Sequence, residues 1–238
     1  QPSEILANIS VTDVSCNGTI DGSAVVNPSG GSGIYNVQWF DGTTINSITG
    51  LQSGYYNVIV TDNTGCTTIN SPTIFIVGQP STLILNANVI DSPSCIGYAN
   101  GSIDVTPMGG SLPYSYNWLD SLNTTISTDS FAINLGSATY NVVVTDINGC
   151  FDTTSIYLTS PDAIVANITT DSTLCNGSSD GSATVNPSGG TAPYTYLWTG
   201  TGSTSVTSNG LNAATTYYVS ITDANGCNLT AVPVTVPE

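Results

Sequence analysis

The stretch CNGTIDGSAVVNPSGGSGIYNVQW, residues 16–39, contains the signals that decide the fold. It occurs again at residues 175–198 with 15 of its 24 residues identical, and in a weaker form at residues 95–118. In each copy a Trp lies 23 residues after the opening Cys: Cys16 and Trp39, Cys95 and Trp118, Cys175 and Trp198. A later Tyr precedes a second Cys by 10 residues each time: Tyr56 and Cys66, Tyr140 and Cys150, Tyr217 and Cys227. A repeat of about 80 residues suits a small self-contained domain, so three domains are predicted, at residues 1–79, 80–160 and 161–238.

Apolar residues alternate with period two throughout the chain, and helix signals are absent. In the quoted stretch, Ala24 and Val26 are predicted to fill the inner face of one strand. A Gly-Gly pair then turns the chain into a strand on which alternate residues from Tyr35 to Trp39 share one face. These patterns predict that the aromatic residues belong to a core and do not form an exposed sugar-stacking platform.

About seven short strands per repeat, with turn signals at regular intervals, are typical of an immunoglobulin-like β-sandwich. The predicted fold class is therefore all-β, with tandem immunoglobulin-like β-sandwich modules placed end to end. The last strand of the first module is predicted to bury Ile74 and Ile76. Short junctions around Pro80 and Pro161 leave little slack between modules. The same Pro-containing punctuation occurs at both termini, so we expect an internal segment of a longer array.

The charge balance excludes several functions. The chain has 16 Asp and Glu residues and no Lys, Arg or His. Nucleic acids and anionic membrane surfaces need cationic contacts, so neither is expected as a partner. Without His or Lys the chain cannot form a Ser-His-Asp triad, an imidazole metal site or a Schiff base. A carboxylate dyad remains possible, but no acidic pair has a recognisable setting for it, and we expect no enzyme. No apolar run is long enough for membrane insertion.

The six cysteines form three equivalent pairs. This usage indicates an oxidising, extracytoplasmic compartment with one bridge in each module. The predicted bridges are Cys16–Cys66, Cys95–Cys150 and Cys175–Cys227, with both cysteines of a module at the same pole of the sandwich. Closing a loop of about 50 residues would stabilise each module by about 4 kcal/mol. Free buried thiols are the alternative interpretation.

The combined pattern resembles a known family. It reads Cys-Asn-Gly-x-x-Asp-Gly-Ser-Ala-x-Val-Asn-Pro-Ser-Gly-Gly, then Tyr-x-x-x-Trp, then Tyr-x-Val-x-Val-Thr-Asp-x-x-Gly-Cys. This is similar to the SprB-type repeat of very large surface adhesins of Bacteroidetes, including those that serve gliding motility. The first and third copies match nearly throughout, whereas the middle copy has Ile96 for Asn and Asn100 for Asp. The resemblance implies a secreted cell-surface protein, a sandwich repeat and an adhesive or filamentous role, and it supplies no catalytic residue.

Acidic residues in two loops are the candidate metal ligands. Calcium takes oxygen ligands, and a chain without cations of its own could recruit it. The candidates lie after the first Cys or before the second one: Asp21, Asp180, Asp62, Asp146 and Asp223. The alternative is that each side chain caps a turn by accepting backbone N–H groups. Asn100 at the position of Asp21 serves a turn as well and a metal poorly, so the turn is favoured.

Three further residues match a short O-glycosylation pattern of Bacteroidetes, Asp-Ser/Thr followed by an apolar residue or Thr: Ser121, Thr153 and Ser172. Ser121 lies in one of the three segments between Trp and Tyr that change in length and sequence: Phe40–Tyr55, Leu119–Thr139 and Thr199–Thr216. Surface loops tolerate such variation, so any partner is expected to bind mainly there. Neutral drift in a spacer explains the variation equally well.

These observations favour a stiff, acidic stalk segment of a bacterial surface adhesin or filament. Neighbouring repeats of the same long chain are the expected partners, and surface polysaccharide or other filament chains are the further candidates. No cofactor is required, with calcium as the one candidate. The alternative function, from a different class, is an array of calcium-dependent carbohydrate-binding modules.

Overall fold

The computed structural model describes residues 3–175 and 177–238, so Asn176 of the third opening motif lies outside the described residues. The described residues form strands β1 to β19 and no helix, and hence no helix that could span a membrane. They divide into two compact units: Gln1–Asn86 with Val105–Asn117 and Val142–Thr154, and Ala87–Asp104 with Trp118–Asn141 and Ser155–Glu238. Each unit contains one whole outer repeat and one junction between repeats. The domain boundaries expected from the sequence stay a prediction.

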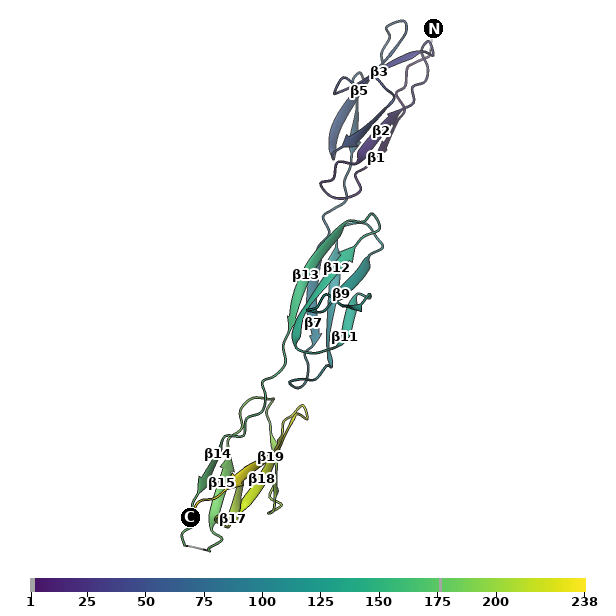
Figure 1. Ribbon diagram of the computed structural model, residues 1–238. Coiled ribbons are helices and arrows are strands. Elements are labelled where there is room, and N and C mark those ends of the chain that lie inside the picture. Colours follow the sequence, from purple (N-terminus) through teal and green to yellow (C-terminus); the bar gives the residue numbers. More distant parts are fainter. Residues whose placement is uncertain (1–2, 176) are drawn as a thin grey trace. The chain divides into compact units, whose positions relative to one another are not determined.

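The first repeat is built from two three-stranded antiparallel sheets (Figure 1). Its strands are β1 (Ile9–Thr12), β2 (Gly22–Val26), β3 (Tyr35–Trp39), β4 (Ser47–Leu51), β5 (Gly54–Asp62) and β6 (Thr73–Val77). One sheet has the order β1-β2-β4 and the other β3-β5-β6. The chain therefore changes sheets between β2 and β3, and again between β3 and β4, as immunoglobulin-like sandwiches do.

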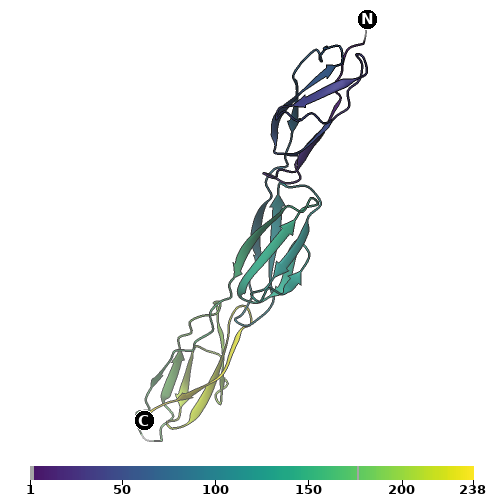
Figure 2. The same cartoon turned by 45° about the horizontal axis from the view of Figure 1, so that its top comes forward.

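The third repeat has the same topology. Its strands are β14 (Ile168–Asp171), β15 (Gly181–Val185), β16 (Thr195–Thr199), β17 (Thr207–Leu211), β18 (Thr216–Thr222) and β19 (Asn228–Thr235). They form the sheets β14-β15-β17 and β16-β18-β19, drawn in green to yellow in Figure 2.

The middle repeat adds one strand to this pattern. Its strands are β7 (Ile84–Asp91), β8 (Gly101–Met108), β9 (Ser115–Leu119), β10 (Thr125–Ser127), β11 (Phe131–Leu135), β12 (Ala138–Thr145) and β13 (Phe151–Leu158). The sheets have the orders β11-β8-β7 and β10-β9-β12-β13. The extra strand β10 lies in the longest of the three variable segments and pairs with β9 at the edge of its sheet.

The predicted inner faces are largely confirmed. The three Trp residues are at most 2% exposed, and Ala24, Val26, Ala183 and Val185 are at most 1% exposed. The predicted inner face of β6 was wrong: Ile74 and Ile76 point outward, and Phe75 and Val77 are buried in their place. Every position from Ile74 to Val77 is apolar, so alternation alone could not choose the face. The pairing of Phe75 opposite Tyr56 in β5 determines it.

The Gly-Gly turn is held by two features in each repeat. The Tyr35 hydroxyl donates to the carbonyl oxygen of Gly30, and Tyr114 and Tyr194 make the same bond to Gly109 and Gly189. Gly30 has φ +84°, and a Cβ there would lie 1.9 Å from the carbonyl oxygen of Glu4. Both the positive φ and the close approach require glycine at this position. The turn therefore lies against the segment by which the chain enters the repeat.

The two cysteines of one repeat lie at opposite ends of the sandwich, so the prediction of a common pole was wrong. The turn after β5 is bonded to the Gly-Gly turn at the N-terminal end, where Gly31 N–H donates to the Ser3 carbonyl. The loop before β2 is bonded to the C-terminal end, where Val14 N–H donates to the Gly78 carbonyl. The reason is topological. Both β3 and β4 run toward the C-terminal end, because β3 is antiparallel to β5 and β4 is antiparallel to β2. The loop before β2 and the turn after β5, which hold the two cysteines, therefore lie at opposite ends.

Candidate functional site: the junctions between repeats

The disulfides join consecutive repeats. Cys16 is bonded to Cys150 and Cys95 to Cys227, with sequence separations of 134 and 132 residues. The predicted bridges Cys16–Cys66, Cys95–Cys150 and Cys175–Cys227 were therefore wrong, because the two cysteines of a repeat lie at opposite ends. In both bridges the first Cys of one repeat is bonded to the second Cys of the next repeat. The two remaining cysteines, Cys66 and Cys175, are exposed free thiols.

The first-cysteine loops (residues 15–21, 94–100 and 174–180) hold the first Cys at the C-terminal end of each repeat. In the first repeat the carboxylate of Asp21 accepts the N–H of Ser15 at 3.0 Å and the hydroxyl of Thr19 at 2.7 Å. The Thr19 hydroxyl in turn accepts the N–H of Cys16 at 3.2 Å. Hydrogen bonds from the side chains of Ser15 and Thr19 and from the Ser15 N–H lower the pKa of Asp21 to about 2. The side chain therefore fixes the loop as an anion over the whole neutral range.

The second-cysteine hairpins (residues 62–66, 146–150 and 223–227) are organised by a buried aspartate, at most 5% exposed in each repeat. In the middle repeat, Oδ1 of Asp146 accepts the N–H groups of Asn148 and Cys150, each at 2.9 Å. Its Oδ2 accepts the Ser111 N–H from the Gly-Gly turn at 2.9 Å. One carboxylate thus closes the hairpin and attaches it to the N-terminal end of the repeat.

Similar contacts lower the pKa of Asp62 and of Asp223. Hydrogen bonds from the Thr64 hydroxyl, and then from the N–H groups of Cys66, Thr64 and Ser32, outweigh burial and lower the pKa of Asp62 to about 2. Burial raises the pKa of Asp223, but backbone donors including Thr191 and Cys227 outweigh it, and the net shift is downward.

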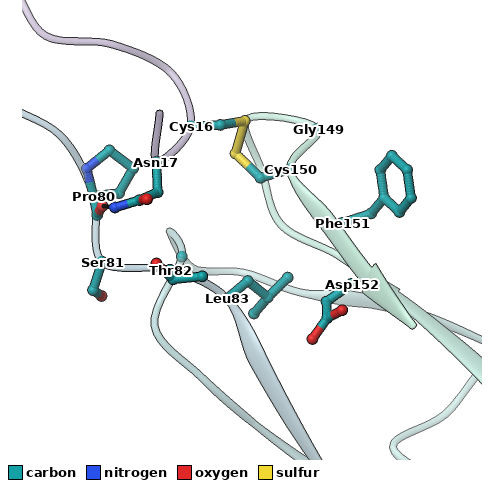
Figure 3. A pocket seen from close by; sticks show the side chains of 11 residues that line it. Cys16, Asn17, Pro80, Ser81, Thr82, Leu83, Gly149, Cys150, Phe151 and Asp152 are labelled. Atoms are coloured by element: carbon teal, nitrogen blue, oxygen red, sulfur yellow. Dashed lines mark hydrogen bonds between the residues drawn. A yellow bond between two sulfur atoms is a disulfide. The ribbon is translucent and has the colours of Figure 1, made fainter. Parts of the chain in front are cut away.

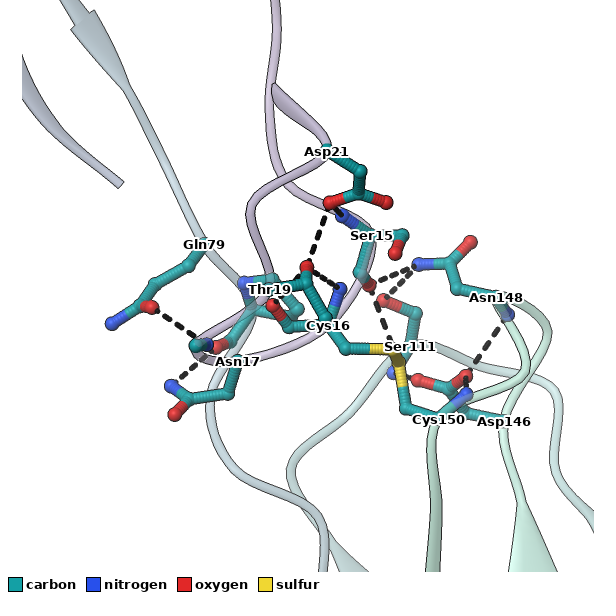
Figure 4. Close-up of a disulfide and its surroundings, with 12 residues drawn as sticks. Ser15, Cys16, Asn17, Thr19, Asp21, Gln79, Ser111, Asp146, Asn148 and Cys150 are labelled. Carbon is teal, nitrogen blue, oxygen red and sulfur yellow. Dashed lines mark hydrogen bonds between the residues drawn. A yellow bond between two sulfur atoms is a disulfide. The ribbon is translucent and has the colours of Figure 1, made fainter. Parts of the chain in front are cut away.

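The junction of the first and middle repeats contains more than the disulfide (Figure 4). The Asn148 side-chain amide donates to the Ser15 carbonyl at 3.1 Å and to the Ser111 hydroxyl at 3.2 Å. On the other side of the loop, the Asn17 amide donates to the Pro80 carbonyl at 3.1 Å. Beside the bridge lies a pocket of about 370 Å³. Figure 3 shows its walls, which include Cys16 and Asn17 from one repeat and Leu83 and Cys150 from the next.

The junction between the middle and third repeats has the same central contacts. The Asn225 amide donates to the Ser94 carbonyl at 3.2 Å and to the Thr191 hydroxyl at 3.1 Å. A smaller pocket of about 200 Å³ adjoins the bridge and is lined on one side by Ile96 and on the other by Ile164. The disulfide and the Asn-to-carbonyl bond are thus common to both junctions.

The calcium candidates serve as turn caps. Asp21 and Asp180 accept bonds within the first-cysteine loops, and Asp62, Asp146 and Asp223 do so within the hairpins. Asn100, which replaces Asp in the middle repeat, accepts the Ser94 N–H at 3.0 Å in the same way. Among residues 3–175 and 177–238, no three Cys, Asp, Glu or His side chains come together as a metal site would require. The structure does not bring the five aspartates together.

The glycosylation candidates Ser121, Thr153 and Ser172 are all exposed. Ser121 lies in a turn closed by Asp120, whose carboxylate accepts the N–H groups of Leu122 and Thr124. Exposure is compatible with modification, which stays a prediction.

Comparison with known proteins places the sequence pattern in a family. The SprB repeat matches the chain three times, over residues 8–44, 87–123 and 167–203. The chain carries three SprB repeats. Among solved structures, the three N-terminal domains of the Hoc outer capsid protein of bacteriophage RB49 are similar, with a TM-score of 0.52 and 12% identity. That match covers 98% of this chain and 97% of the phage chain and reflects the tandem immunoglobulin-like fold alone.

A three-domain immunoglobulin segment of titin, I67–I69, has a TM-score of 0.41 and 13% identity, and the match covers 99% of this chain and 98% of that one. The comparison with curated proteins gave no match.

Each matched SprB segment includes the first-cysteine loop, the Gly-Gly turn and the Trp, and ends before the second-cysteine hairpin. Sequence reasoning missed Asn148 and Asn225, the hairpin residues that bond across the junctions. A signal was present: the middle and third SprB repeats read Asn-Gly-Cys at this place, whereas the first reads Thr64-Gly65-Cys66. The signal could be used only once the hairpin was known to face the preceding repeat.

Proposed function

We propose that this chain is a structural segment of a large secreted bacterial surface adhesin, in which it acts as a stiff, acidic stalk. The SprB-type repeat resembles segments of Bacteroidetes surface adhesins, including those that serve gliding motility. The role is mechanical and adhesive, and the absence of Lys, Arg and His leaves few side chains suited to catalysis. Disulfide use fits an extracellular location, because such bridges persist in oxidising environments.

One observation carries the stalk proposal: two covalent connections join each repeat to the next. The polypeptide crosses the first junction near Pro80, and the Cys16–Cys150 bridge crosses it a second time. A single flexible linker permits bending in all directions. Two separate attachments restrict it, and the Asn148-to-Ser15 hydrogen bond adds a third point of contact.

The bridges also change how the chain carries tension. When it is pulled by its ends and fully unfolded, the shortest covalent path runs through residues 1–16, 95–150 and 227–238. Residues 17–94 and 151–226 form loops outside that path. Most of the first and third repeats is therefore protected from full extension, which suits a stalk under load.

The expected organisation follows from this proposal. Domains at residues 1–79, 80–160 and 161–238 are the stalk modules, and neighbouring repeats of the same chain are their main partners. Any surface polysaccharide or filament chain is met at the variable segments, chiefly Leu119–Thr139 with its additional strand β10 (Thr125–Ser127). The three exposed candidates Ser121, Thr153 and Ser172 are the places to look for glycans.

Single-molecule force spectroscopy of the 238-residue chain tests the proposal. The covalent path of about 84 residues limits the oxidised chain to a contour of about 290 Å, at about 3.4 Å per residue, against about 800 Å after reduction. Replacing Cys95 and Cys227 by Ala should give an intermediate contour of about 360 Å. Replacing the free Cys66 and Cys175 by Ser is the matched control and should change nothing. An oxidised chain that extends as far as the reduced one would overturn the proposal.

A further inference from the structure

The two free thiols occupy positions that are bonded elsewhere in the same chain. Cys175 is the first Cys of its repeat, as are the bonded Cys16 and Cys95. Cys66 is the second Cys of its repeat, as are the bonded Cys150 and Cys227. One thiol therefore lies at a C-terminal end and the other at an N-terminal end, the two ends that a junction joins.

The described residues of the Cys175 loop make the same hydrogen bonds as the bonded loops. Its carbonyl accepts the Ser178 N–H at 3.0 Å, as the Cys16 carbonyl accepts the Thr19 N–H at 3.2 Å. The Leu174 N–H donates to Asp180 at 3.2 Å, as the Ser15 N–H donates to Asp21. Leu174, Cys175, Ser178 and Asp180 thus keep the bonds found at the other two C-terminal ends, although no described residue is disulfide-bonded to Cys175.

The hairpin of Cys66 is likewise preformed. The Cys66 N–H donates to Asp62 at 3.0 Å, and the equivalent bonds of Cys150 and Cys227 measure 2.9 and 2.8 Å. The Asp62 N–H donates to the Cys66 carbonyl at 2.9 Å, the distance found at Asp146 and Cys150.

The pocket beside Cys66 is the counterpart of the junction pocket without the wall that a preceding repeat supplies. It has a volume of about 390 Å³ and is lined by Ser3, Glu4, Ile5, Gly31, Asp62, Cys66, Thr67 and Ile69. The middle repeat contributes the equivalent residues to the first junction pocket: Ser81, Thr82, Leu83, Gly110, Cys150 and Phe151. There, Cys16 and Asn17 of the preceding repeat complete the wall. At Cys66 no described residue occupies that place, and Ile69 is 74% exposed.

We infer that the N-terminal surface around Cys66 is a docking site for the first-cysteine loop of another SprB repeat, and that a second copy of this chain fills it with its own Cys175. The copies then join head to tail through a Cys175–Cys66 disulfide. The inference concerns these two surfaces and does not rest on the stalk role. The contact differs from the two internal junctions on both sides of the hydrogen bond that crosses them. Thr64 stands where Asn148 and Asn225 donate, and Leu174 stands where Ser15 and Ser94 supply the accepting carbonyl.

The chemistry needs a disulfide oxidant, for which oxidised glutathione serves. The Cys175 thiolate attacks the glutathione disulfide and releases one glutathione thiolate, leaving a mixed disulfide on the protein. The Cys66 thiolate of the docked copy then attacks the protein sulfur and releases the second glutathione thiolate. Two thiols become one disulfide, and one oxidised glutathione becomes two reduced glutathiones.

The test mixes two single variants in a glutathione redox buffer. Cys66→Ser retains the Cys175 thiol, and Cys175→Ser, labelled with heavy nitrogen, retains the Cys66 thiol. Intact-mass spectrometry then counts the heterodimer and both homodimers. Random exchange would make the heterodimer about twice as abundant as each homodimer. Docking should raise that ratio to about twentyfold or more, a tenfold gain over random exchange that is equivalent to one decade in affinity.

Two further arms keep the result decisive. Thr64→Asn in the Cys66 partner should raise the heterodimer yield about fivefold, because it supplies the missing hydrogen bond. Thr64→Ser, which retains the hydroxyl, should leave the yield unchanged. Peptic peptide maps must show Cys16–Cys150 and Cys95–Cys227 intact in every variant. A statistical mixture, an excess of homodimers, or no dimers while both thiols react with a maleimide would each overturn the inference.

Discussion

The two junctions have the same central contacts, which we call the shared centre, and they differ in the contacts around it. Both have a disulfide from the first Cys to the next repeat's second Cys, and both have an Asn amide bonded to the carbonyl before the first Cys. In the first junction Asn17 donates to the Pro80 carbonyl, and the Gly18 N–H donates to the Gln79 side chain at 3.2 Å. In the second, Ile96 replaces that Asn and lines a smaller pocket.

The difference separates what a junction requires from what can vary. A polar contact to the linker and an apolar residue against a pocket both accompany the same bridge. We therefore assign the joining of repeats to the disulfide and its Asn, and treat the surrounding contacts as replaceable.

The largest expected effect is the loss of a bridge. The double variants Cys16→Ala/Cys150→Ala and Cys95→Ala/Cys227→Ala should each lower the free energy of unfolding of the adjoining repeats by about 2–5 kcal/mol, because a long covalent loop is opened. Differential scanning calorimetry measures the loss. Similar losses at both junctions would support a shared centre. A loss at only one of them would show that the surrounding contacts matter more.

A smaller effect is expected from the buried hairpin aspartate. In Asp146→Asn, an amide group must replace one of two carboxylate oxygens, which together accept N–H groups from Ser111, Asn148 and Cys150. One N–H then loses its acceptor, which should lower the free energy of unfolding by about 1–3 kcal/mol. Urea denaturation measures this loss. The matched control is Asp21→Asn, which should cost far less, because Asn100 already accepts the Ser94 N–H at the equivalent position. Equal losses from the two changes would contradict the assigned roles.

The smallest effect concerns the Asn side chains at the bridge. Asn148→Ala and Asn225→Ala each remove an amide that bonds the preceding repeat. Each should shift the glutathione equilibrium of its own bridge toward the thiols by about fivefold, equivalent to about 1 kcal/mol. Asn17→Ala should shift only the first bridge, and by less, because its amide makes one bond, to the Pro80 carbonyl, whereas the Asn148 amide makes two. Unaltered equilibria in the first two variants would remove Asn from the shared centre.

Much of the fold could be predicted from the sequence. The alternation around Ala24 and Val26, the Gly-Gly turn and the inward Trp39 follow from local patterns, and the structure confirms them. The face of the last strand could not be chosen, because the run Ile74–Val77 is apolar at every position. Pairing across strands decides such a case, and a single sequence does not contain the pairing.

The disulfide pattern failed for a related reason. Three equivalent pairs of cysteines are compatible with bridges inside repeats or between them. The choice depends on which end of the sandwich each Cys occupies, and that depends on the directions of β3 and β4. These strands follow one another yet run the same way, because the chain changes sheets between them. Neither spacing nor composition reports such a crossing, so the functional role of Asn148 was hidden as well.

Non-reducing peptide mapping tests the central claim most directly. Trypsin has no Lys or Arg at which to cut, so pepsin is used, with free thiols alkylated first. We predict peptides that link Cys16 to Cys150 and Cys95 to Cys227, with alkylated Cys66 and Cys175. Peptides that link Cys16 to Cys66 or Cys95 to Cys150 would contradict the account, because the bridges would then lie within repeats and not between them.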